Sequence, residues 1–140
     1  MQDITVFIQN HLLLSLVLVI ALILLIIIEF VKQNSGATRL TPRRATHLIN
    51  HMDAVIVDIR DSEAFNKGHI VNAINLPSKE IEQKIQKIDK FKSQPVILVC
   101  ATGVESQRAF MTLQKKGFNV QVLDGGMRAW REAEMPVVKS

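Results

Sequence analysis

One stretch of the sequence brings a nucleophile to the end of a buried strand. Residues 96–99 are aliphatic and mostly β-branched, which predicts a strand that is buried on both faces. This strand runs directly into Cys100, the only cysteine of the chain. A turn of small residues that includes Gly103 follows, and the apolar spacing over residues 104–116 predicts a helix.

This arrangement suits a reactive thiol. A side chain at the carboxyl end of a parallel strand points into the crevice where α/β sheets bind ligands. Backbone N–H groups of a loop and of a helix N-terminus favour an anionic sulfur, and they lower a thiol pKa from about 8.5 to roughly 3.5–7.5. A free cysteine is also often a small buried hydrophobic residue. The position of Cys100 alone does not decide between these two interpretations.

The surrounding pattern predicts the elements that position this loop. Strands alternate with helices, which favours a parallel sheet flanked by helices, an α/β fold. The predicted strands are residues 55–57, 73–76, 96–99 and 120–123, and the predicted helices are residues 41–50, 62–67, 78–91, 104–116 and 127–134.

Composition restricts the classes of function. The single cysteine excludes an intramolecular disulfide framework, and the scattered histidines offer no metal-ligand spacing, so we expect no metal and no cofactor. Residues 37–140 carry 16 Lys and Arg against 11 Asp and Glu. Aromatic residues make up only 5% of the chain and tyrosine is absent, which argues against nucleic acid as the partner. Anionic lipid is the more economical explanation of the positive charge.

The first 36 residues differ from the rest of the chain. Residues 4–28 carry no formal charge at neutral pH. A helix of this length reaches about 37 Å, more than the roughly 30 Å of a bilayer's hydrocarbon core. A cleaved signal peptide would need a basic start and a small-residue cleavage site, and the sequence has neither. We therefore expect a transmembrane anchor that contacts lipid through residues 4–31, a short polar linker at 33–36, and a domain at 37–140.

The charges that flank this segment predict its orientation. Lys32, Arg39, Arg43 and Arg44 follow the apolar segment, whereas no Lys or Arg precedes it. Positive charge favours the cytoplasmic side of a membrane. We therefore expect a single-pass protein with its N-terminus outside and its domain in the cytoplasm.

Three segments together resemble a single-domain rhodanese. The first contains Asp58 and Arg60 and continues through Gly68-His69-Ile70 to Pro77. The second is the Cys100-Ala101-Thr102-Gly103 loop, and the third runs from Gly117 through Asp124-Gly125-Gly126 to Trp130. The resemblance covers residues 40–135, and an anchor helix before one such domain is seen in bacterial members. It therefore implies a rhodanese fold attached to the inner membrane.

The resemblance also implies sulfur transfer. Cys100 would be the nucleophile and would carry a persulfide between a sulfur donor and a thiophilic acceptor, neither of which the sequence identifies. Asp58 and Arg60 match a buried charged pair that supports the site. The hydroxyls of Thr102 and Ser106 would either bond the sulfur or cap the next helix. The persulfide-binding loop would comprise Ala101, Thr102, Gly103, Val104, Glu105 and Ser106.

Glu105 departs from the family pattern. The family loop commonly has an arginine at this position, which would attract thiosulfate. Two unit charges about 6 Å apart interact by roughly 3 kcal/mol at an effective dielectric near 20. We therefore expect weak activity towards thiosulfate and a donor that is neutral, cationic or a partner protein's persulfide. The alternative is a non-catalytic, membrane-tethered module that retains the fold to bind a membrane or sulfur-relay protein.

Overall fold

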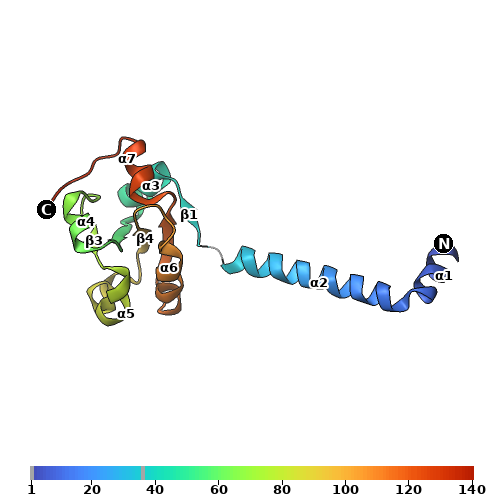
Figure 1. Cartoon of the computed structure of the whole chain (residues 1–140). Coiled ribbons are helices and arrows are strands. Elements are labelled where there is room, and N and C mark those ends of the chain that lie inside the picture. The colour runs from blue at the N-terminus through green and yellow to red at the C-terminus, as the bar shows by residue number, and fades with distance from the viewer. Residues whose placement is uncertain (1, 36) are drawn as a thin grey trace. The chain divides into compact units, whose positions relative to one another are not determined.

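The computed structural model describes residues 2–35 and 37–140, with side chains described for 4–29 and 37–140. The chain divides into two units, Met1–Gly36 and Ala37–Ser140. The first is helical and the second contains the sheet (Figure 1).

The N-terminal unit contains one helix that is long and apolar enough to cross a membrane. Helix α1 (Gln2–Asn10) is followed by α2 (Leu12–Ser35), and the two helix axes diverge at His11 (Figure 1). The apolar part of α2 is Leu12–Glu29, and none of it is buried within the protein. One uninterrupted span from residue 4 was expected, and the break between the two helices at His11 corrects this prediction.

The expected linker is also partly wrong. Residues 33–35 belong to α2, and Gly36 lies outside the described residues. Polarity suggested a linker, but Gln, Asn and Ser do not prevent an established helix from adding further hydrogen-bonded residues. Helix formation therefore continues past the end of the apolar stretch.

The C-terminal unit is built on a five-stranded parallel sheet in the order β1-β5-β4-β2-β3. This confirms the predicted α/β class. The strands are β1 (Arg39–Leu40), β2 (Val55–Asp58), β3 (Ile74–Asn75), β4 (Pro95–Val99) and β5 (Asn119–Leu123). Strand β1 was not predicted, because two residues are too few to show a period; it is specified by its pairing with Val122 and Leu123.

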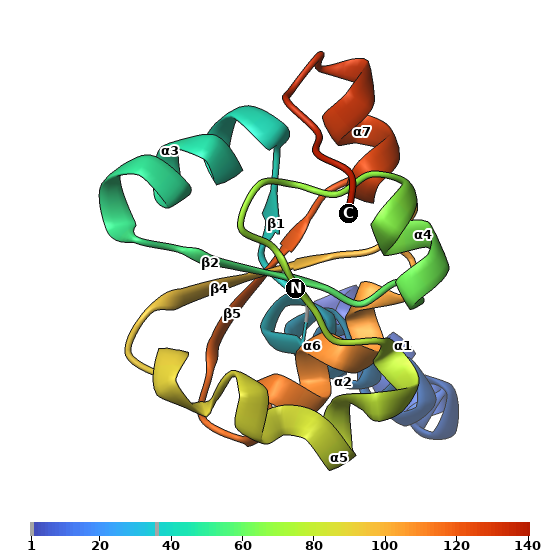
Figure 2. The same ribbon diagram turned by 90° about the vertical axis from the view of Figure 1, so that its left-hand side faces the viewer.

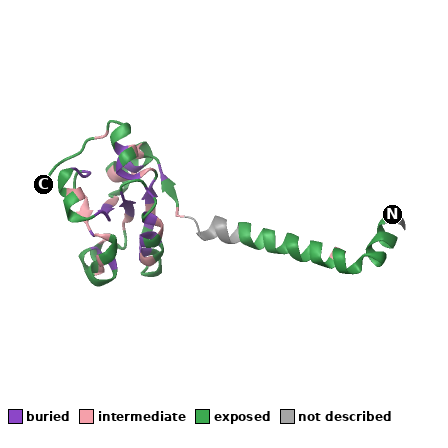
Figure 3. Cartoon of the chain, viewed as in Figure 1, coloured by how far each residue is buried: buried purple, intermediate pink, exposed green. Residues whose placement is uncertain are grey.

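Helices cover both faces of this sheet. Figure 2 shows α3 (Pro42–Met52) and α7 (Gly126–Glu132) on one side and α5 (Ile81–Lys84) and α6 (Ser106–Lys115) on the other. The short helix α4 (Ser62–Lys67) follows β2. Two apolar clusters fill the space between the sheet and these helices. The buried residues accordingly lie inside this unit, as the purple segments of Figure 3 show.

The start of α3 follows from its sequence. Thr41 is the N-cap residue, and its side-chain oxygen accepts a hydrogen bond from the Arg44 N–H at 3.3 Å. Pro42 occupies the first helical position, where its missing N–H has no consequence. The predicted helix start is therefore confirmed, although α3 continues to Met52, two residues beyond the expected end.

The predicted helix over residues 78–91 is wrong in its regularity. The chain forms short pieces, namely η1 (Ser78–Glu80), α5, η2 (Ile85–Lys87) and η3 (Asp89–Phe91). Ile81 and Ile88 are nevertheless buried. Helical spacing of apolar residues requires only that one side of the segment faces the core, and successive tight turns satisfy that requirement as well.

Candidate active site

Cys100 lies directly after the central strand. In β4 the side chains of Val96 and Leu98 join the cluster that faces α6, whereas Ile97 and Val99 join the opposite cluster. Cys100 continues the first series and is only 1% exposed. The two-residue period of the strand therefore directs the thiol towards the α6 side of the sheet.

The turn after the cysteine brings a backbone donor to the sulfur. The Gly103 N–H donates a hydrogen bond to Cys100 Sγ, with N and Sγ 2.8 Å apart. Gly103 has φ of +88°, and a Cβ atom there would lie 3.2 Å from the Gly125 nitrogen. Glycine is required both by the left-handed backbone and by this close approach. Among the described loop residues, Gly103 supplies the N–H that reaches the sulfur.

The start of α7 holds the same loop from its other side. The Met127 N–H donates to the Cys100 carbonyl at 2.8 Å, and the Arg128 N–H donates to the Ala101 carbonyl at 3.1 Å. A Cβ atom on Gly126 would lie 2.2 Å from the Cys100 oxygen. Gly126, Met127 and Arg128 were not predicted to belong to the site. The signal was present in the Gly125-Gly126 pair, which follows a strand and opens a helix.

The remaining loop side chains divide into exposed and buried positions. Ala101, Thr102, Val104 and Glu105 are exposed. Ser106 is fully buried, and its hydroxyl has no hydrogen-bond partner among the described residues. The N-cap residue of α6 is Glu105, and its side chain makes no capping hydrogen bond. The capping role considered for the hydroxyls of Thr102 and Ser106 is therefore not observed among the described residues. The helix also begins at Ser106 and not at residue 104, since the intervening residues form the turn over the cysteine.

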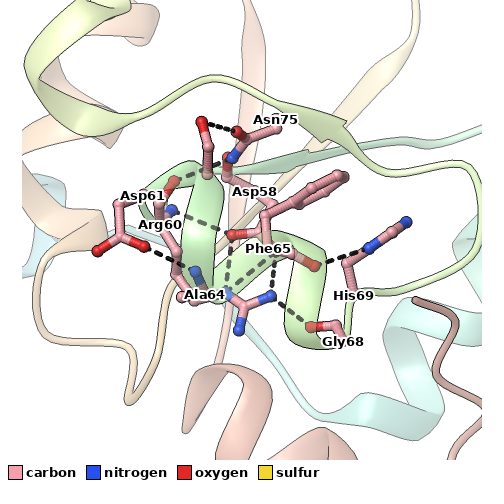
Figure 4. Close-up of polar contacts among 9 residues, drawn as sticks. Asp58, Arg60, Asp61, Ala64, Phe65, Gly68, His69 and Asn75 are labelled. Carbon is pink, nitrogen blue, oxygen red and sulfur yellow. Dashed lines mark hydrogen bonds and ion pairs between the residues drawn. The ribbon is translucent and has the colours of Figure 1, made fainter. Parts of the chain in front are cut away.

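Asp58 and Arg60 form a buried ion pair beside the strand that carries the cysteine. Arg60 Nη2 lies 2.7 Å from Asp58 Oδ2, and Arg60 Nε donates to both carboxylate oxygens (Figure 4). The same guanidinium donates to the Gly68 carbonyl at 2.8 Å. Asp58 is paired in register with Val99, the residue before Cys100. The pair thereby joins β2 to the chain after α4, and its supporting role for the site stays a prediction.

His69 follows Gly68 in the chain and contacts Phe65 of α4. Its ring stacks on Phe65 with centroids 3.8 Å apart, and Nδ1 lies 2.9 Å from the Phe65 carbonyl oxygen (Figure 4). Its backbone exchanges two hydrogen bonds with Val138, which ties the C-terminal segment to this loop.

A groove of about 790 Å³ lies between the segment at 78–84 and helix α6, next to the cysteine loop. Val104 and Met111 contribute apolar surface and are 77% and 46% exposed. The groove also carries charges of both signs, from Lys79, Glu82, Glu105 and Arg108. Glu105 therefore stands on the boundary between this groove and the loop that holds Cys100.

The fold and the loop define a class of protein, namely a parallel α/β domain that places a cysteine loop at the carboxyl end of its central strand. Residues 41–133 match the rhodanese-like domain family. The chain belongs to this family.

Similar proteins include both whole-length and domain-length relatives. YibN of Escherichia coli K12, described as uncharacterized, is 36% identical over 99% of both chains. The thiosulfate sulfurtransferase GlpE of Shewanella oneidensis is 44% identical over 79 residues, which are 56% of this chain and 76% of the relative. The crystal structure of a rhodanese-related protein from Thermoplasma volcanium is 25% identical with a TM-score of 0.67, covering 74% of this chain and 99% of that one.

Proposed function

We propose that the protein transfers sulfane sulfur through a persulfide on Cys100. The Cys100 thiolate attacks the sulfane sulfur of a donor, a new S–S bond forms, and the donor's own bond to that sulfur breaks so that the donor leaves with the electron pair. A thiophilic acceptor then attacks the outer sulfur and releases the Cys100 thiolate. The two displacements balance without any added oxidant or reductant.

The observation that carries this proposal is the hydrogen bond from the Gly103 N–H to Cys100 Sγ. A donor held by a rigid turn favours negative charge on the sulfur that it faces. The similarity to a relative described as a thiosulfate sulfurtransferase adds support for the same reaction class.

Thiosulfate is a poor donor in this proposal. Glu105 places a carboxylate at the entrance to the loop, where related loops commonly carry an arginine, and it is exposed in the groove beside Cys100. A dianion approaching this carboxylate is repelled. We propose a donor that is neutral or cationic at its sulfur-bearing end, or a persulfide presented by a partner protein.

The intact mass of the full chain, purified in lipid nanodiscs, tests the proposal. After incubation with a low-molecular-weight persulfide, we expect an adduct of one sulfur atom that disappears on addition of cyanide. Cys100→Ser should form no such adduct. The absence of any adduct on the unmodified chain, with thiosulfate and with the persulfide, would exclude sulfur transfer through this residue.

A second candidate is a non-catalytic module that binds a partner protein. The exposed apolar residues Val104 and Met111 beside the loop favour it, because a protein partner would cover this surface. Loss of the adduct together with retained binding of a partner would favour this function.

We also propose that α2 anchors the domain in the cell inner membrane, with the N-terminus outside and the domain in the cytoplasm. The support is the apolar segment Leu12–Glu29 and the basic residues that follow it. A cleaved signal sequence is the competing explanation for such a helix near an N-terminus.

A further inference from the structure

The segment that leads from α2 into α3 carries positive charge without compensation. No Asp or Glu occurs between Glu29 and Asp53, whereas Lys32, Arg39, Arg43 and Arg44 lie within that interval. Such a run is either paired with acidic residues from elsewhere in the fold or directed towards an anionic partner.

The structure shows that the fold does not neutralise the α3 part of this run. Arg39 pairs with Asp124 at 3.4 Å. Arg43 and Arg44 are exposed, and their side chains form no ion pair within the described part of the chain. With Thr41 and His47 they line a shallow hollow of about 330 Å³.

These arginines lie on the side of α3 that faces away from the core. Ala45 is buried and Leu48 and Ile49 pack against the core cluster, whereas Arg43, His47 and Asn50 recur at the spacing of the opposite helix face. We call the exposed set Arg43, Arg44, His47, Asn50 and His51 the α3 basic face.

The neighbouring helix does not cancel this charge. Helix α7 lies on the same side of the sheet as α3 (Figure 2). Residues 126–134 contain two positive charges, on Arg128 and Arg131, and two negative charges, on Glu132 and Glu134. Arg128 is paired with Glu132 at 3.8 Å. The contribution of α7 is therefore close to neutral, and the α3 basic face keeps its positive charge.

The length of the connecting chain limits how far this face can be from the membrane. Helix α2 ends at Ser35 and α3 begins at Pro42, so residues 36–41 connect them. Six residues reach at most about 21 Å when fully extended, and residues 30–35 of α2 add about 9 Å beyond the apolar segment Leu12–Glu29. The α3 segment is therefore tethered within about 30 Å of the bilayer, which allows it to contact an anionic leaflet, where attraction acts within the Debye length of about 8 Å.

We propose that the α3 basic face rests on the anionic headgroups of the bilayer in which α2 is anchored. The partner is therefore the anionic phospholipid surface itself. The proposal rests on the membrane anchor, and it is independent of the chemistry of Cys100.

The test uses the full chain in nanodiscs of phosphatidylcholine and of equal parts phosphatidylcholine and phosphatidylglycerol, each with the same small fraction of a lipid whose headgroup carries gadolinium in a closed, neutral chelate. A nitroxide label at position 50 (Asn50→Cys with Cys100→Ser) reports relaxation by this gadolinium, which the imidazoles of His47 and His51 do not ligate. We expect strong relaxation in the anionic discs and little in the neutral ones. Because an Arg near an anionic surface contributes about fivefold in affinity, Arg43→Gln with Arg44→Gln should lower the contact equilibrium about 25-fold.

Lys115→Gln with Lys116→Gln is the matched control, because it removes the same charge from an exposed position at the end of α6. It should leave the label's relaxation unchanged. Equal relaxation in neutral and anionic discs, or equal effects of the two double variants, would overturn the proposal. Co-purification of every variant with its disc shows that the anchor remains inserted, so loss of headgroup contact is distinguished from loss of the anchor.

Discussion

At the scale of single residues, the site combines a buried cysteine, which we propose as the nucleophile, with an exposed negative charge. Cys100 is 1% exposed, whereas Glu105 lies in solvent at the edge of the groove. Solvent weakens the influence of Glu105 below the value expected for a buried carboxylate. The charge on this side chain should therefore tune the choice of donor without controlling the reactivity of the thiol outright.

Glu105→Arg should raise kcat/KM for thiosulfate about tenfold, because it replaces repulsion of a dianion with attraction that solvent and salt partly screen. Steady-state transfer of sulfur to cyanide measures this effect. Glu82→Arg is the matched control, since Glu82 is exposed in the same groove and the substitution changes the net charge equally. Equal gains in the two variants would show that Glu105 has no specific role.

Ser106→Ala should lower the rate of sulfur transfer without destabilising the fold. The Ser106 hydroxyl is buried and has no hydrogen-bond partner in the described part of the chain. An unpartnered buried polar group costs about 1–3 kcal/mol, so its removal should leave the thermal midpoint unchanged or raised. A loss of activity would then report a hydrogen bond that the hydroxyl donates to bound sulfur. Parallel thermal melts and transfer rates measure the two effects, and a lower midpoint with unchanged transfer would contradict this role.

At the scale of elements, the position of the cysteine depends on how α7 meets the end of β4. Two backbone N–H groups of α7 bond the carbonyls of Cys100 and Ala101, and Gly126 allows the contact by lacking a side chain. Gly117 also has a positive φ, but nothing lies within 4 Å of the Cβ atom it would gain. An alanine at position 117 would therefore introduce backbone strain alone, whereas an alanine at position 126 would introduce both backbone strain and a steric clash.

Gly126→Ala should destabilise the protein by about 3 kcal/mol or more and should reduce formation of the Cys100 persulfide, because the new methyl group displaces the loop. Gly117→Ala carries the strain of the left-handed backbone alone, about 1–2 kcal/mol, and should leave persulfide formation intact. Denaturant unfolding and intact mass measure both effects. Equal behaviour of the two variants would show that the contact between α7 and the loop does not matter.

The elements also show what the sequence could and could not predict. The strands around Val57, Leu98 and Val122 were predictable because each is a short apolar segment rich in β-branched residues. The breaks between residues 78 and 91 were not, because helical spacing constrains burial and not the regularity of the backbone. The Gly103 contact followed from the turn, whereas the role of Gly126 depends on a contact between segments 26 residues apart, Cys100 and Gly126, which no local pattern encodes.

At the scale of the whole molecule, the chain joins an apolar helix to an α/β domain, and the consequence for function depends on whether this helix is retained. Relatives such as YibN align over 99% of both chains, so the similarity extends through the N-terminal segment. A retained helix would hold the domain, its groove and the α3 basic face close to a bilayer.

The chain isolated from cell membranes should have the intact mass of all residues, allowing for removal of the first methionine, and should resist alkaline extraction. Protease added to the outer side of the inner membrane should leave the domain uncut, because the basic residues after α2 favour the cytoplasm. Mass spectrometry of the membrane fraction and protease protection measure these properties. A soluble product that begins after the apolar segment would identify α2 as a signal sequence instead.

The two edges of the sheet are formed by β1 and β3, and each is only two residues long. Exposed edge strands are templates for pairing with another chain, and short edges offer few unpaired backbone groups. Proteins confined to a bilayer meet one another in two dimensions, with their domains held at a common height. The short edge strands would therefore limit aggregation through strand pairing at a membrane surface, where domains of neighbouring molecules meet often.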